Sequence, residues 1–134
     1  MRFFTVFLFF SFTIQCATAQ NLIGYKENEI RKYMRENKKD MSLHKVTNSK
    51  FSYLKYSDSS ESQTMLFFLN KDSVCQSIRI ICDENAKALR LKEFNSVYKK
   101  NNDNRWIDSR NGKSFMIELR EEKWASVITM ELYK

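Results

Sequence analysis

The chain has very few of the residues on which common catalytic and metal sites depend. Its 134 residues include one histidine, two glycines and no proline. A single histidine excludes histidine-rich metal sites, and the HExxH, CxxC and GxSxG motifs do not occur. A phosphate-cradling loop needs several glycines close together, whereas Gly24 and Gly112 stand far apart. The sequence therefore favours a protein that is not an enzyme and that needs no cofactor and no metal.

The longest hydrophobic run lies at the N-terminus. Residues 3–14 (FFTVFLFFSFTI) follow the basic Arg2 and precede Ala17-Thr18-Ala19, a small-residue cleavage signal. The run is shorter than the roughly 20 apolar residues that span a bilayer. We predict a signal peptide at residues 1–19, a periplasmic or secreted location, and no stable membrane anchor after cleavage. An uncleaved anchor is one alternative; a lipid anchor at Cys16 is another, disfavoured because Gln15 precedes it.

The remaining residues, 20–134, are expected to form a single α+β domain. They are numerous enough for one hydrophobic core, and they contain no proline-rich or low-complexity boundary. Without Arg2 they carry 22 basic and 16 acidic side chains, a net charge of +6. This charge weakly favours anionic partners.

Residues 63–82 (QTMLFFLNKDSVCQSIRIIC) predict the central β-hairpin of a sheet. Two apolar runs flank the polar turn Asn70-Lys71-Asp72-Ser73. The run at residues 65–69 is unbroken, so both faces of that strand carry hydrophobic side chains that need cover. Cys75 and Cys82 lie seven residues apart on the second strand. This separation of about 23 Å, on opposite faces, predicts free thiols rather than a disulfide.

Two helices are predicted, at residues 26–37 and 84–100. In the first, Ile30, Tyr33 and Met34 form one apolar stripe. In the second, Asp83 or Asn85 caps the start. Its broad apolar face consists of Ala86, Leu89, Leu91, Phe94, Val97 and Tyr98.

The other segments predict strands. Residues 42–47 and 51–57 form one hairpin, while residues 105–109, 113–120 and 124–133 form a meander with an Asn111-Gly112 turn. In the meander the alternation predicts one buried face, made of Phe115, Ile117, Leu119, Trp124, Ser126, Ile128, Met130 and Leu132. The element order α-β-β-β(-β)-α-β-β-β predicts an antiparallel sheet of six to seven strands with both helices packed on one face. This order resembles TATA-box-binding-protein-like and β-lactamase-inhibitor-like architectures, and also small exported bacterial α+β proteins of unknown function. No specific motif supports the resemblance, so it transfers no functional residue.

Because two helices cover only one face of a sheet, the second apolar face predicts a binding surface for a protein or peptide, or for a second copy in a homodimer. The candidate contact residues on this face are Tyr53, Tyr56, Phe67 and Trp106.

Two alternative functions remain open. One is an electrostatic binder of anionic envelope polymer through the basic patch Arg31, Lys32, Arg35, Lys38 and Lys39. Export disfavours nucleic acid as its partner. The other is a small extracytoplasmic hydrolase that uses His44 and scattered carboxylates such as Glu118 and Glu131.

Overall fold

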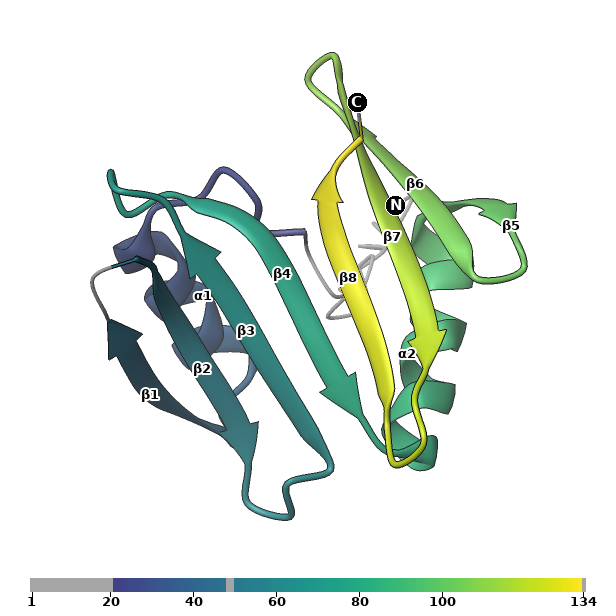
Figure 1. The fold of residues 1–134 in the computed structure, drawn as a ribbon, viewed down its shortest axis with the longest axis horizontal. Helices are drawn as coiled ribbons and strands as arrows, with labels where there is room; N and C mark the ends of the chain where they lie inside the picture. Colours follow the sequence, from purple (N-terminus) through teal and green to yellow (C-terminus); the bar gives the residue numbers. More distant parts are fainter. Residues whose placement is uncertain (1–20, 48–49, 134) are drawn as a thin grey trace, which may run out of the picture.

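The protein has an α+β fold. The computed structural model describes residues 21–47 and 50–133, and within them it contains two helices and one antiparallel sheet of eight strands (Figure 1). In chain order the elements are α1 (Glu27–Asn37), β1 (Met41–Thr47), β2 (Ser52–Asp58), β3 (Gln63–Leu69), β4 (Cys75–Cys82), α2 (Glu84–Val97), β5 (Lys99–Asn102), β6 (Arg105–Arg110), β7 (Lys113–Glu121) and β8 (Ser126–Leu132). The predicted signal peptide lies outside the described residues.

The sheet consists of two units of a helix followed by four strands. Its strand order is β1-β2-β3-β4-β8-β7-β6-β5, so each unit is a meander and the two meet where β4 pairs with β8. This pairing extends from Ser77 opposite Glu131 to Cys82 opposite Ser126. Beyond Ser77 the two strands diverge, as Figure 1 shows.

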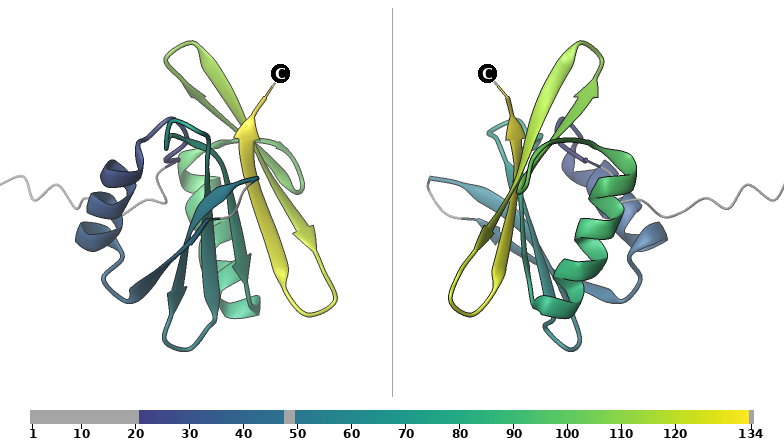
Figure 2. Two further views of the ribbon diagram at one scale, coloured as in Figure 1. Left: turned by 60° about the vertical axis from the view of Figure 1, so that its left-hand side comes forward. Right: turned by 90° about the vertical axis from the view of Figure 1, so that its right-hand side faces the viewer.

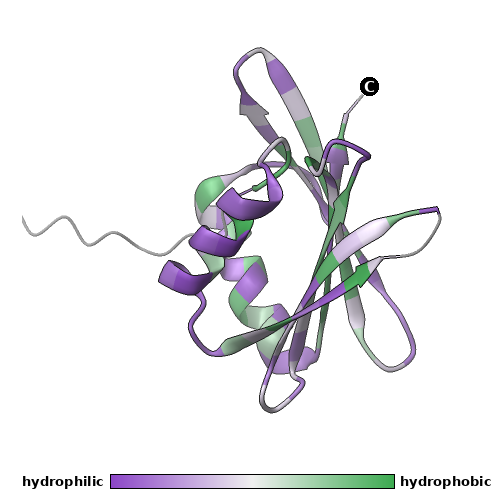
Figure 3. Ribbon diagram, turned by 90° about the vertical axis from the view of Figure 1, so that its left-hand side faces the viewer, coloured by the Kyte–Doolittle hydropathy of each residue, from purple (hydrophilic) through white to green (hydrophobic). Residues whose placement is uncertain are grey.

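Both helices lie on the same side of the sheet (Figure 2). Alternate residues of the strands point toward them, as in β3, where Met65, Phe67 and Leu69 are buried and the residues between them are partly exposed. The core between sheet and helices also contains Ile30 and Met34 from α1, Phe94 from α2, and Ile78, Ile80, Ile117, Ile128 and Met130 from the strands. Away from the sheet the ribbon of α1 is mostly hydrophilic (Figure 3).

The prediction of six to seven strands is wrong because it missed β5. The second helix ends at Val97, and Tyr98 adopts an extended backbone (φ −109°, ψ 155°). The next four residues, KKNN, are exposed and pair with β6. An exposed edge strand without hydrophobic residues has no alternating pattern, so periodicity could not reveal it.

The predicted apolar face of α2 is also partly wrong. Leu89 is 72% exposed and Val97 44% exposed, whereas Arg90 is only 3% exposed. The Arg90 guanidinium donates through Nε to Gln63 Oε1 (2.6 Å) and through Nη1 to Glu93 Oε2 (3.3 Å). These hydrogen bonds compensate for the burial of the Arg90 charge, at a position where hydrophobic periodicity predicts an exposed residue.

Two predicted strand faces need correction. A register shift between β3 and β4 leaves Gln76 as an extra residue, so Cys75 and Cys82 both face the helices instead of opposite sides. They are free, buried thiols, as the disulfide argument predicted. In the meander, Phe115, Ile117 and Leu119 are buried as expected. Trp124 precedes β8 and is 88% exposed, with the Lys123 ammonium 5.3 Å from its ring centroid.

Candidate functional site

The structure separates the four aromatic residues that were predicted to form a binding surface. Tyr56, Phe67 and Trp106 are 4%, 0% and 1% exposed and lie on the helix-covered face, so their predicted placement on the open face is wrong. Tyr56 and Phe67 pack edge to face (ring centroids 5.9 Å apart), and the Trp106 indole donates to Asn95 Oδ1 (2.9 Å). Tyr53 alone among the four lies on the open face.

On that open face Tyr53 belongs to a row of aromatic side chains that crosses β2 and β3. Tyr53 pairs directly with Phe68, with ring centroids 5.5 Å apart, and Phe51 stacks on Tyr53 at 5.7 Å. The Arg79 guanidinium of β4 lies 5.7 Å from the Phe68 ring centroid. We call Phe51, Tyr53, Phe68 and Arg79 the aromatic ladder. Phe51 is 47% exposed, and both described helices lie on the other side of the sheet (Figure 2).

Sequence reasoning missed three members of this ladder: Phe51, Phe68 and Arg79. Phe67 and Phe68 are neighbours in one apolar run, so the sequence shows two aromatic faces without showing which face the helices cover. The cross-strand register could have supplied the signal, because the residue opposite Tyr53 must share its face.

The open face of the second unit is different in character. Met116 and Ile107 are partly exposed there and pair across β7 and β6. Next to them Arg105 Nε lies 3.3 Å from Glu118 Oε2. This part of the face mixes single apolar side chains with paired charges, so it lacks a continuous apolar surface.

Four of the five predicted basic-patch residues line one cavity between α1 and the β1–β2 hairpin. We call it the cation cavity; its volume is about 320 Å³ and its basic residues are Arg31, Arg35, Lys38 and Lys39. Met34, Met41, Leu43 and Tyr56 form its apolar walls. Lys32, the fifth member of the patch, does not line it.

Two ionisable groups in the cation cavity have displaced pKa values. Burial, and then the positive charge of Arg90, lowers the pKa of the Lys38 ammonium, while Glu93 and Asp40 oppose the change. Burial raises the pKa of the Tyr56 phenol, and the charges of Arg31 and Arg35 act in the opposite direction. The cavity therefore holds a partly desolvated ammonium beside a neutral phenol.

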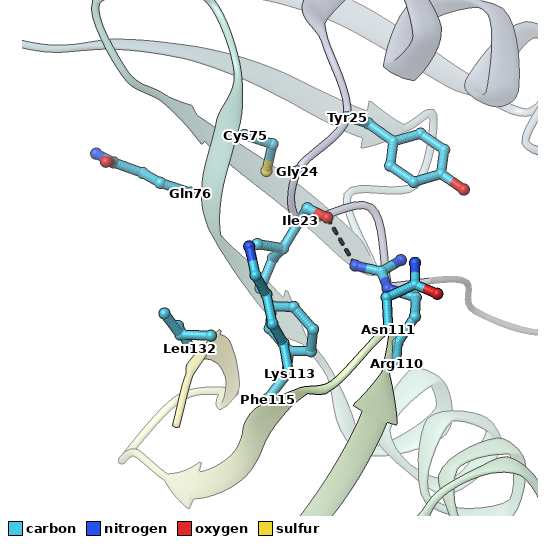
Figure 4. Close-up of a pocket in the computed structure, with 10 residues that line it drawn as sticks. All are labelled: Ile23, Gly24, Tyr25, Cys75, Gln76, Arg110, Asn111, Lys113, Phe115 and Leu132. Atoms are coloured by element: carbon cyan, nitrogen blue, oxygen red, sulfur yellow. Dashed lines mark hydrogen bonds between the residues drawn. The ribbon is translucent and has the colours of Figure 1, made fainter. Parts of the chain in front are cut away.

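A larger cavity of about 460 Å³ opens where β4 and β8 diverge (Figure 4). We call it the seam cavity. The N-terminal segment crosses it and pairs with β4, since Gly24 N donates to Cys75 O (2.8 Å) and Cys75 N to Tyr25 O (2.9 Å). Lys113 is an exposed cation at its rim, and Phe115 and Leu132 give it an apolar wall.

The arginine of the seam cavity is engaged in holding this N-terminal segment. Arg110 donates through Nη1 to Asn21 O and through Nη2 to Ile23 O, both at 2.7 Å. Its guanidinium also lies 5.0 Å from the Phe115 ring centroid. Asn21 is held a second time, because its Nδ2 donates to Asp108 Oδ2 (3.0 Å). Because these contacts occupy the guanidinium of Arg110, its role is to hold the N-terminal segment against the sheet.

The groups of the predicted hydrolase do not converge. His44 and Glu118 share the open face, but β2, β3, β4 and β8 lie between their strands, which separates them by about 24 Å. Glu118 is paired with Arg105, and Glu131 is exposed on β8. Neither His44 nor Glu131 lines the cavities described above. Among the described residues, no three His, Cys, Asp or Glu side chains are grouped so as to hold a metal ion.

No helix in the described part of the chain combines the length and the apolar character needed to cross a membrane. Comparison with protein-family models, with curated proteins and with solved structures found no match for this chain. The likeness of its element order to known architectures therefore stays a prediction, and functional inference depends on the chemistry of the surfaces described above.

Proposed function

We propose that this protein is an exported, non-enzymatic binding domain that docks a protein partner on the aromatic ladder. The observation that carries the proposal is the continuous row of rings and guanidinium on the open face, with centroid separations of 5.5 to 5.7 Å from Phe51 to Phe68. Tyrosine, phenylalanine and arginine are enriched in the buried centres of protein interfaces, where a few such residues supply most of the binding energy.

The location of the ladder supports this proposal. Tyr53 and Phe68 are already ordered by the sheet, so a partner that packs on them has little side-chain entropy to remove. The second unit presents paired charges on the same face, which suit the polar rim of an interface. Dispersal of His44, Glu118 and Glu131 argues against the hydrolase.

The test is site-specific photo-crosslinking in the source organism. A photoreactive phenylalanine analogue replaces Phe68 in one strain and Lys92, an exposed residue of α2, in the control strain. We expect one defined protein adduct from position 68, absent from position 92 and lost when Phe51 and Tyr53 are both changed to serine. An adduct of twice the chain mass would identify the partner as a second copy. The same adducts from both positions, or none from position 68, would refute the proposal.

Export is tested separately by the mass of the mature protein. We expect a chain that begins at Gln20, as the cleavage signal at Ala17-Thr18-Ala19 predicts. A mass that includes residues 1–19 would show that the segment stays attached.

A further inference from the structure

The cation cavity, on the opposite side of the sheet from the aromatic ladder, concentrates positive charge on one stripe of α1. Arg31 and Arg35 are spaced i and i+4, which places them above one another on the same side of the helix, and Lys38 follows at the residue that caps the C-terminus of α1. Like charges at this spacing repel one another unless a counter-charge lies between them. Lys39 adds a fourth cation at the same opening.

The protein supplies almost no counter-charge for this stripe. Within the described part of the chain, Arg35, Lys38 and Lys39 form no ion pair, and Arg31 lies 3.9 Å from Glu27 Oε1. Lys45 binds that same carboxylate oxygen much more closely, at 2.7 Å. No carboxylate lines the cavity. Asp40 and Glu93 act on the Lys38 ammonium, but the positive charge of Arg90 acts on it more strongly than either.

The floor of the cavity adds a neutral hydrogen-bonding group and apolar surface. Tyr56 lines it, with a buried ring and a hydroxyl that can both donate and accept a hydrogen bond. Met34, Met41 and Leu43 complete the wall, so a ligand meets cations at the opening and hydrophobic surface below. The helix on one side and the β1–β2 hairpin on the other enclose a compact ligand better than a long polymer.

We propose that the cation cavity binds a phosphomonoester whose ester group is apolar. The phosphate group concentrates up to two negative charges and three acceptor oxygens at one point, which matches converging guanidinium and ammonium donors; a carboxylate brings one charge. The apolar ester group packs on the methionine, leucine and tyrosine walls. The site is independent of the aromatic ladder, because the two lie on opposite faces of the sheet.

The test measures binding to the purified protein by calorimetry in 0.15 M NaCl, with phenyl phosphate as the probe. Inorganic phosphate and benzyl alcohol report the charged and apolar parts alone. Vesicles of phosphatidylcholine with and without phosphatidic acid distinguish a lipid headgroup from a soluble phosphomonoester. The variants are Arg35→Gln and Tyr56→Phe, and the control is Lys32→Gln, which removes the same charge from the same helix outside the cavity.

We expect saturable binding of phenyl phosphate, weakened roughly tenfold or more by Arg35→Gln and unchanged by Lys32→Gln, since the loss of one charge-assisted hydrogen bond exceeds about 1.4 kcal/mol. Tyr56→Phe keeps the ring and weakens binding less. Binding of phosphatidic acid vesicles alone, with the same dependence on Arg35, supports the proposal with a lipid as the source.

Three results overturn the proposal: no binding of any phosphate probe, equal weakening by Arg35→Gln and Lys32→Gln, or equal affinity for inorganic and phenyl phosphate. Absence of binding would show that the cavity is not a phosphate site. Equal weakening by both variants would show that binding depends only on the overall positive charge of the helix. The third removes the role of the apolar walls. Thermal unfolding of each variant verifies that it is folded; Arg35 is exposed, so its change leaves the core intact.

Discussion

Replacing Arg110 with alanine tests whether the N-terminal segment is a structural part of the sheet. Arg110 holds Asn21 and Ile23 by their carbonyl oxygens, and the neighbouring residues Gly24 and Tyr25 pair with the start of β4, where β8 has diverged from it. Without the guanidinium, both carbonyls lose their charged donor and the segment loses its main attachment to β6. We therefore expect Arg110→Ala to loosen this segment before the rest of the fold.

The magnitude follows from the two bonds. A hydrogen bond from a charged donor contributes about 1.5 to 3 kcal/mol, and partial exposure of Arg110 favours the lower value for each. Stacking on Phe115 adds about 0.5 kcal/mol. Arg110→Ala should then lower the free energy of unfolding by about 3.5 kcal/mol, and Arg110→Lys, which keeps the charge and one donor direction, by about 2 kcal/mol. Native domains have free energies of unfolding of about 5 to 15 kcal/mol, so a loss of this size is measurable.

Urea unfolding gives the free energy, and hydrogen exchange shows where the structure opens. We expect faster exchange at the amides of Gly24 and Cys75, which pair the segment with β4, than at the amides of β7. The matched control is Arg105→Ala on the same strand: its exposed ion pair with Glu118 should contribute less than 1 kcal/mol. Equal losses for Arg105→Ala and Arg110→Ala, or a loss below about 1 kcal/mol for Arg110→Ala, would refute this reasoning.

Two further predictions concern the thiol of Cys75 and the Asn111-Gly112 turn. Burial raises the pKa of the Cys75 thiol from 9.0 to about 12. Above pH 9 the thiol ionises in the unfolded chain but not in the folded protein, so the free energy of unfolding falls between pH 9 and 12 by up to about 1.4 kcal/mol per pH unit. Cys75→Ala should flatten this alkaline slope in urea titrations at pH 8 to 10; an unchanged slope would assign it to other groups. Gly112 has φ +75° with open space around it, so Gly112→Ala should cost about 1 kcal/mol through backbone strain alone. Ser109→Ala on the same hairpin should cost less, because it removes only a long, exposed contact with Ser114 Oγ (3.5 Å).

The sequence predicted those elements in which apolar and polar residues alternate regularly. In β7 the alternation of Phe115, Ile117 and Leu119 with polar residues identified both the strand and its buried face. Where the pattern is uniform, the face was undetermined: Phe67 and Phe68 are chemically alike, and only packing of the helices buries one and leaves the other partly exposed. Tyr56 and Phe67 were misplaced for this reason.

The buried charge of Arg90 made the predicted apolar face of α2 partly wrong, whereas the basic residues of α1 could be identified from the sequence. A buried arginine is not expected from periodicity, because its position depends on partners such as Gln63, which lies 27 residues earlier in the chain. The basic patch of α1 could be read from its local i, i+4 spacing. Its cavity could not, since Met41, Leu43 and Tyr56 come from strands whose placement the helix alone does not specify.

The two units share one architecture but use their charges differently. In the second unit Lys87 pairs with Glu84 and Glu121, and Arg90 bonds to Gln63 and Glu93, so the cations of α2 that face the sheet stabilise the fold. In the first unit Arg35, Lys38 and Lys39 form no ion pair within the described residues, and Arg31 has only a 3.9 Å contact with Glu27. The aromatic ladder on the opposite face is not covered by the described helices. These surface groups are the ones that we propose to bind ligands. We therefore expect substitutions in the second unit to reduce stability, and substitutions at Arg35 or Phe68 to reduce binding first.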